Sequence, residues 1–210
     1  MIELSVAEAI DRATLLAARG RAMIGICGCP GGGKSTLSAA ITTEVHSSVV
    51  VPMDGFHLLN EDLVRLGRRD RKGAPDTFDV EGYVALLERV RGQVPGEVIS
   101  APRYDRAASA PVPEAIAVEP DIALVITEGN YLLLEQPPWN EVRSLLDEVW
   151  FVDIDDAVRA GLAVDRAQHL GVGRDDGLEP DLFDGARHRG QIAQSVINDA
   201  DHRDPRARGQ

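Results

Sequence analysis

The apolar positions of the chain form short runs that alternate with longer stretches of mixed polarity. Four runs have the length and composition of buried strands: residues 22–27, 48–53, 122–127 and 148–154. The stretches before and between them predict helices, by spacing or by composition, at residues 3–19, 34–46, 58–66, 80–92 and 139–146. Strands that alternate with helices favour an α/β fold, here a three-layer α/β/α sandwich with a mainly parallel sheet.

A second, smaller pair of strands is expected outside this sheet. Residues 96–102 and 114–120 lie between prolines and alternate or cluster their apolar positions, which is typical of a peripheral β-ribbon. The segment PRYDR, residues 102–106, is then expected to be a loop that the ribbon flanks.

The composition changes beyond Asp156. Only 11 of the 54 residues from Ala157 to Gln210 are Val, Ile, Leu, Met, Phe, Trp or Tyr, whereas 16 are Arg or Asp. A final buried strand needs more apolar residues than this. We therefore expect a core over residues 1–156 that includes the lead-in helix, a helix over 157–170, and then an atypical, loosely ordered tail without a strand, all in one domain.

Charge and hydropathy exclude several classes of partner. The chain has 22 Lys and Arg against 34 Asp and Glu, a net charge of −12, which argues against a nucleic-acid-binding surface. No apolar run approaches the roughly 20 residues that span a bilayer, and the first residues are acidic where a signal peptide is basic. We expect a cytoplasmic protein without membrane or nucleic-acid partners. Cys27 and Cys29 are too few for a disulfide framework or a four-ligand zinc site, which favours packing roles over a redox role.

Residues 28–35 (GCPGGGKS) fit the motif G-x-x-x-x-G-K-S/T and lie between a predicted strand and a predicted helix, the context that this P-loop motif requires. Its glycines let backbone N–H groups face phosphates, and the start of the helix adds partial positive charge. Lys34 is expected to reach the β- and γ-phosphates, and the Ser35 hydroxyl to bind Mg²⁺. The motif predicts an ATP site formed by Gly28, Gly31, Gly32, Gly33, Lys34, Ser35 and Thr36.

The rest of the chain narrows the class of P-loop protein. A GTPase is expected to carry N-K-x-D, and no Asn of this chain precedes a Lys. A typical Walker-B ATPase ends its third strand with Asp, whereas here Thr127 and Glu128 follow the apolar run. Neither class fits well.

Polar residues that follow the predicted strands are candidates for chemistry, because ligands bind at the carboxyl edge of such a sheet. Asp54 follows the second strand and is the candidate base that takes the proton of an acceptor hydroxyl, with capping as the alternative. His57, in the same loop, binds substrate or is structural. Glu128 would hold Mg²⁺ through water, with a structural carboxylate as the alternative. Asn130 and Tyr131 follow it into the crevice.

Cations and aromatic residues gather in the loops of this acidic chain. The cations are Arg71, Lys72, Arg103 and Arg106. The aromatic residues are Phe56, Phe78, Tyr104 and Tyr131. Local positive charge suits an anionic ligand, although pairing with loop aspartates on a solvated face is the alternative, and aromatic residues in loops suggest a substrate platform more than a core. The candidate substrate-binding residues are Asp54, His57, Arg71, Lys72, Phe78, Tyr104, Arg106, Asn130 and Tyr131.

With the P-loop, the segments MDGFH, RKGAPDTFD, PRYDR and TEGNYLLL occur in an order that resembles the P-loop kinase family of uridine kinase and bacterial pantothenate kinase, above all its bacterial branch often labelled as fructose-transport kinases. The resemblance covers about residues 20–156 and implies the kinase-type P-loop NTP hydrolase fold. It matches Asp54 to the family's catalytic aspartate, Lys34 and Ser35 to its phosphate and magnesium residues, Glu128 to its third-strand acid, and Tyr104 and Arg106 to its substrate-side loop.

The resemblance also implies a lid helix after the core, and here the chain departs from the family pattern. Arg166 is the nearest match to a catalytic lid arginine. A diverged tail is one explanation, and a reading-frame change shortly after Asp156 is another.

We therefore predict an ATP- and Mg²⁺-dependent kinase that transfers the γ-phosphoryl group to a hydroxyl of a small metabolite, such as a nucleoside like uridine, a sugar or a pantothenate-like compound. The alternative is a nucleotide-binding P-loop protein with impaired transfer because its C-terminal lid is incomplete. An NTPase that hydrolyses its nucleotide without an acceptor is a third hypothesis. The sequence leaves a homodimer open.

Overall fold

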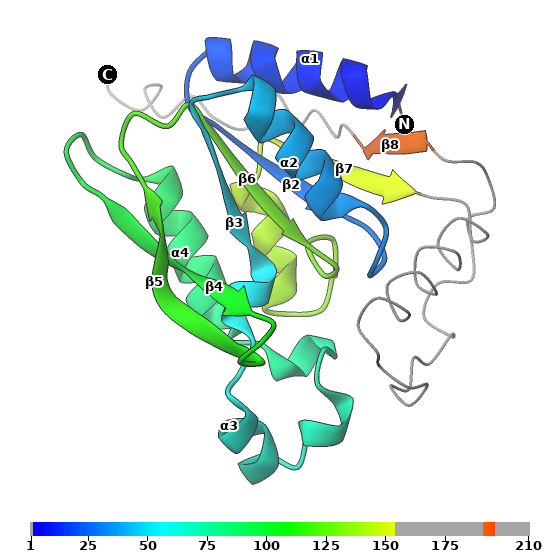
Figure 1. The fold of residues 1–210 in the computed structure, drawn as a ribbon, viewed down its shortest axis with the longest axis vertical. Helices are drawn as coiled ribbons and strands as arrows, with labels where there is room; N and C mark the ends of the chain where they lie inside the picture. Colours follow the sequence, from blue (N-terminus) through cyan, green and yellow to red (C-terminus); the bar gives the residue numbers. More distant parts are fainter. Residues whose placement is uncertain (1, 154–190, 196–210) are drawn as a thin grey trace, which may run out of the picture.

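The computed structural model describes residues 2–153 and 191–195, and Figure 1 shows their arrangement. The elements follow in chain order, with 3₁₀ helices labelled η: β1 (Ile2–Leu4), α1 (Val6–Ala18), β2 (Ala22–Cys27), α2 (Lys34–Glu44), β3 (Ser48–Pro52), η1 (Met53–Phe56), α3 (Asn60–Arg65), η2 (Arg69–Arg71), η3 (Pro75–Thr77), α4 (Val80–Arg91), β4 (Ile99–Asp105), β5 (Ala110–Val118), β6 (Leu124–Gly129), η4 (Trp139–Leu145), β7 (Glu148–Asp153) and β8 (Gln191–Ser195).

The main sheet has the strand order β1-β8-β7-β2-β6-β3. Strands β7, β2, β6 and β3 run parallel, which confirms the four core strands and the mainly parallel sheet that the sequence predicts. Strands β1 and β8 add an antiparallel edge. The P-loop strand β2 is therefore central, with β6 beside it and β3 at the far edge.

Helices cover both faces of this sheet (Figure 1), and a hydrophobic core lies on each face. On one face, α1 and α2 pack through Ala13 and Ile41 against side chains such as Ile24. On the other face, α4 and η4 pack through Leu87 and Val142. The three-layer α/β/α arrangement is thus present.

Local sequence explains where helix α1 begins. Ser5 and Glu8 form a capping box, in which the Glu8 N–H donates to the Ser5 hydroxyl at 3.3 Å and the Ser5 N–H donates to the Glu8 carboxylate at 2.8 Å. Arg12 on the same helix pairs with the buried Glu148 of β7, which also accepts from the indole of Trp150 at 2.9 Å. These contacts fasten the lead-in helix to the sheet.

Three sequence expectations need correction. The sequence suggests no strand beyond residue 170, yet β8 pairs with both β7 and β1 through backbone hydrogen bonds, which side-chain composition does not reveal. The predicted ribbon is present as β4 and β5, but PRYDR lies mostly within β4 rather than in a loop. The predicted helix at 139–146 is the 3₁₀ helix η4.

Arg166 and the helix predicted at 157–170 lie outside the described residues. Within the described ranges, no helix has the length and apolar character needed to cross a membrane.

Candidate active site

The loop between β2 and α2 has the backbone that the P-loop motif requires. Gly28, Gly31 and Gly33 have φ values of 145°, 75° and 85°, which side chains rarely adopt. A Cβ on Gly28 would lie 2.6 Å from the Val152 oxygen of β7, whereas Cβ atoms on Gly31 and Gly33 would meet nothing within 4 Å. Helix α2 begins without a side-chain cap, so no capping side chain occupies its first N–H groups, which suits an anion at this end of the helix.

The Lys34 ammonium is held at this loop by three oxygens. It donates to the carbonyls of Gly28 and Cys29, both at 2.9 Å, and to Oδ1 of Asn130 at 2.7 Å. Burial lowers the pKa of Lys34, while the charges of Glu128 and Asp54 act to raise it. Asn130 follows β6, so the loop lysine is tied to the neighbouring strand by a contact that the motif does not predict.

Glu128 lies beside the start of α2. Strand β6 pairs with β2, as the expected strand order requires, and Glu128 stands level with Ile26. Its carboxylate accepts from Ser35 Oγ at 2.8 Å and from Ser38 Oγ at 3.0 Å. Sequence reasoning missed Ser38, although its position three residues after Ser35 on a helix places both hydroxyls on one face.

The oxygen atoms of Ser35, Ser38 and Glu128 suit the binding of Mg²⁺. Hydroxyl and carboxylate oxygens are its preferred protein ligands, and Mg²⁺ commonly completes its shell with phosphates and water. The described residues contain no group of three or more His, Cys, Asp or Glu that could hold a metal alone. Ser35 and Glu128 together thus fit a partial site that a bound nucleotide would complete.

Asp54 stands in η1, directly after β3. That strand pairs with β6, and Pro52 stands level with Glu128. The main-chain oxygen of Asp54 accepts from the His57 N–H at 3.2 Å and lies 2.9 Å from His57 Nδ1. A Cβ on Gly55 would lie 2.4 Å from the Pro102 oxygen, so glycine lets η1 press against β4. Among the described residues, no hydrogen bond engages the Asp54 carboxylate.

An aromatic and cationic cluster continues from η1. The His57 ring lies 4.0 Å from that of Phe78 and 4.8 Å from that of Tyr104, between centroids. Lys72 Nζ lies 5.3 Å from the centroid of Tyr104 and donates to Asn60 Oδ1 at 2.8 Å and to the Ser109 oxygen at 2.9 Å. Burial lowers the pKa of His57, the hydrogen bond to Asp54 and the charge of Asp54 act to raise it, and the charge of Lys72 lowers it.

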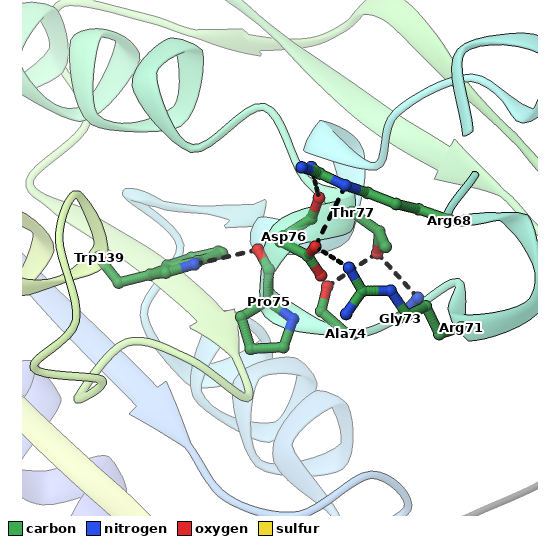
Figure 2. Close-up of polar contacts among 8 residues, drawn as sticks. All are labelled: Arg68, Arg71, Gly73, Ala74, Pro75, Asp76, Thr77 and Trp139. Carbon is green, nitrogen blue, oxygen red and sulfur yellow. Dashed lines mark hydrogen bonds and ion pairs between the residues drawn. The ribbon is translucent and has the colours of Figure 1, made fainter. Parts of the chain in front are cut away.

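Figure 2 shows the polar contacts of the loop at residues 68–77. Asp76 pairs with both Arg68 and Arg71. Arg71 therefore pairs with a loop aspartate, which is the alternative to binding an anionic ligand. Within the loop, Thr77 Oγ1 accepts from the Gly73 N–H at 2.9 Å and donates to the Ala74 oxygen at 2.8 Å.

Two aromatic side chains fasten this loop to the body of the protein. Trp139 Nε1 donates to the Pro75 oxygen at 3.1 Å, as Figure 2 shows, and the Tyr131 hydroxyl donates to the Gly73 oxygen at 2.6 Å. The loop is therefore anchored from two elements far along the chain, and Tyr131 serves as one of its anchors.

Phe56 and Phe78 correct the expectation of an aromatic platform. Both are buried in the core that includes α4, since loops that cross a core face can bury their aromatic residues there. Tyr104 and Tyr131 stay half-buried. Arg103 and Arg106 are exposed on β4 and in the turn after it.

Burial raises the pKa of Cys27 to about 12, which agrees with a packing role.

The fold and this loop geometry define a P-loop kinase-type protein. Residues 23–169 match the model of the "Phosphoribulokinase / Uridine kinase family", and the chain belongs to this family. The resemblance drawn from its motifs is thereby confirmed. Family membership supports phosphotransferase chemistry and implies the use of ATP, typically with Mg²⁺.

Individual relatives agree with this assignment. The chain is 35% identical over 162 residues to a Schizosaccharomyces pombe protein named "Putative uridine kinase", covering 72% of this chain and 68% of that protein. It is 40% identical over 138 residues to YggC of Escherichia coli K12, covering 63% of this chain and 56% of YggC. The crystal structure of a "putative fructose transport system kinase" from Silicibacter sp. TM1040 matches with a TM-score of 0.70 and 34% identity, covering 82% of this chain and 85% of that one.

Proposed function

We propose that the protein transfers the γ-phosphoryl group of ATP to a hydroxyl of a small metabolite. The observation that carries this proposal is the arrangement at one edge of the sheet. The P-loop follows β2, Glu128 lies at the end of β6, and Asp54 follows β3, and these three parallel strands are adjacent. A phosphate-binding loop and a carboxylate that no hydrogen bond engages among the described residues therefore stand at the same carboxyl edge.

The phosphate side of the site consists of residues 28–36 with Ser38, Glu128 and Asn130. In our proposal, the loop N–H groups and the Lys34 ammonium hold the β- and γ-phosphates. Ser35 and Glu128 would hold Mg²⁺, which would compensate the charge that builds up on the phosphate oxygens during transfer. Lys34 leaves its contacts with Gly28, Cys29 and Asn130 when it engages phosphate.

The acceptor side consists of Asp54, His57, Lys72 and Tyr104. Asp54 takes the proton of the acceptor hydroxyl while the oxygen of that hydroxyl forms its bond to the γ-phosphorus. The bond from this phosphorus to the bridging oxygen breaks, and the electron pair stays on ADP. Two observations support this role: no hydrogen bond engages the Asp54 carboxylate among the described residues, and Asp54 stands directly after β3, the strand beside the one that carries Glu128.

The names of the relatives suggest acceptors to test first. One relative is named as a uridine kinase and another as a fructose transport system kinase, and a pantothenate-like compound follows from the family resemblance. All three offer a primary hydroxyl.

The decisive experiment is a panel of hydroxylated metabolites incubated with the full chain, ATP and Mg²⁺, with ADP release and the phosphorylated product both measured. The proposal expects ADP release that depends on one acceptor, together with a product heavier by one phosphoryl group. The Lys34→Ala variant is the control for contaminating kinases. Phosphate release without acceptor would indicate an NTPase, and nucleotide binding without transfer would indicate a kinase with an incomplete lid.

A further inference from the structure

Lys72 is the cation of the acceptor side, and its surroundings are polar but uncharged. Its ammonium contacts the Asn60 amide oxygen, the Ser109 carbonyl and the face of Tyr104. These partners come from the start of α3, from the turn after β4 and from β4 itself. No carboxylate pairs with Lys72 within residues 2–153 and 191–195.

The same loop holds two cations that do pair with a carboxylate. Arg68 and Arg71 share the single carboxylate of Asp76, which compensates part of their charge within the loop (Figure 2). Lys72 follows Arg71 directly, yet its amide, carbonyl and aromatic partners hold the ammonium in place without cancelling its charge. A half-buried cation held in this way attracts an anion more strongly than a fully solvated one, because less water competes for it.

A line of contacts joins Lys72 to the base. The ammonium lies over Tyr104, the Tyr104 ring contacts His57, and His57 bonds to the main chain of Asp54. The lowered pKa of His57 keeps that ring neutral at neutral pH, so the cluster presents one carboxylate at one end and one cation at the other. A ligand with its hydroxyl at Asp54 therefore meets positive charge at its other end.

We infer that the acceptor carries an anionic group, a carboxylate or a phosphate, and that Lys72 binds this group while Asp54 faces the hydroxyl to be phosphorylated. This inference rests on the proposed kinase function. It restricts the acceptors to anionic hydroxyl compounds, and it makes Lys72 a specificity-determining residue.

The test uses acceptor pairs that differ in one anionic group. Glycerol and D-glycerate test a carboxylate, and fructose and fructose 6-phosphate test a phosphate. Wild type, Lys72→Gln and Lys72→Arg are compared by kcat/KM for transfer, and by binding of each compound with a non-hydrolysable ATP analogue present. Arg65→Gln is the matched control, since Arg65 is an exposed cation on α3 paired with Asp62.

We expect wild type to prefer the anionic member of at least one pair, and Lys72→Gln to lower that preference by about 10-fold to 100-fold, the range for a lost charge-assisted contact. Lys72→Arg should keep most of the preference for the anionic member, and Arg65→Gln should keep all of that preference. A purely structural Lys72 would lower transfer to both members alike. Preference for the neutral members, or a preference that survives Lys72→Gln, would overturn the inference.

Binding separates this inference from the proposed function. Anion binding that depends on Lys72, without transfer, would contradict the kinase function and support the inference. Absence of both binding and transfer across the panel would overturn the inference as well.

Discussion

On the phosphate side of the site, one continuous segment, the P-loop with the start of α2, and the end of the adjacent strand β6 supply almost every group, and many of these groups are backbone atoms. On the acceptor side, the groups come from η1, from the loop before η3 and from the ribbon strand β4, and they meet through side chains. The first arrangement depends on a short local sequence. The second depends on how distant segments pack.

The two sides therefore differ in how they should respond to substitution. On the phosphate side, a Cβ at Gly28 would collide with β7, so the loop leaves little room for a change at this position. The acceptor side rests on peripheral elements, so its residues can change one at a time without disturbing the sheet. We therefore expect substitutions on the phosphate side to lower turnover through the phosphates or the metal, and those on the acceptor side to alter rate or specificity for the acceptor.

The largest effect is expected for Lys34→Ala. Removing this cation should lower kcat by a factor of about 100 or more, since it takes away charge stabilisation of roughly 3 kcal/mol in the transition state. Steady-state transfer with the acceptor from the panel measures it, with Arg65→Gln as the control. Turnover within threefold of wild type would show that Lys34 does not stabilise the phosphates during transfer.

Asp54→Asn is expected to lower kcat by about 100-fold while ATP affinity stays nearly unchanged, because the amide keeps the shape of the side chain but cannot take a proton. Isothermal titration with a non-hydrolysable ATP analogue and initial rates together give both quantities. A parallel loss of ATP affinity would place Asp54 on the phosphate side instead.

Thr127 links the strand that carries Glu128 to the strand that leads to Asp54. It precedes Glu128 in β6 and donates to the Val51 oxygen of β3 at 2.7 Å. The buried Tyr83 hydroxyl lies 2.6 Å from the Thr127 hydroxyl. Thr127→Val should cost about 1–3 kcal/mol of unfolding free energy, because it leaves buried polar groups unpaired. Urea denaturation measures it. Tyr83→Phe combined with Thr127→Val should cost less than the sum of the single changes, and strict additivity would refute the coupling.

The smallest effect is expected for His57 and concerns pH. The pKa of His57 in the folded state is lowered from 6.5, so just below pH 6.5 the unfolded chain binds more protons at His57 than the folded chain does. Stability therefore falls as pH drops from 6.5 towards the folded-state pKa. His57→Gln should flatten this part of the curve of unfolding free energy against pH. An unchanged slope would show that His57 is not held neutral on the acceptor side.

The sequence predicts the local features of the molecule well and the distant contacts poorly. The P-loop and the core strands can be read from contiguous residues, because a glycine motif and an apolar run each carry their own signal. The hydrogen bond that Lys34 donates to Asn130 joins residues 96 positions apart, and the one that Lys72 donates to Ser109 joins residues 37 positions apart. Phe78 illustrates the limit most clearly, since its loop position suggests exposure while the core behind it enforces burial.

A Mg²⁺ titration of turnover for wild type, Glu128→Gln and Asp54→Asn tests the division between the two sides most directly. If Glu128 acts with the metal and Asp54 with the acceptor, the Glu128 variant should recover much of its rate as Mg²⁺ rises. The Asp54 variant should stay below about one tenth of the wild-type rate at every concentration. Recovery of Asp54→Asn above that level, or a Glu128→Gln rate that does not respond to Mg²⁺, would contradict the account.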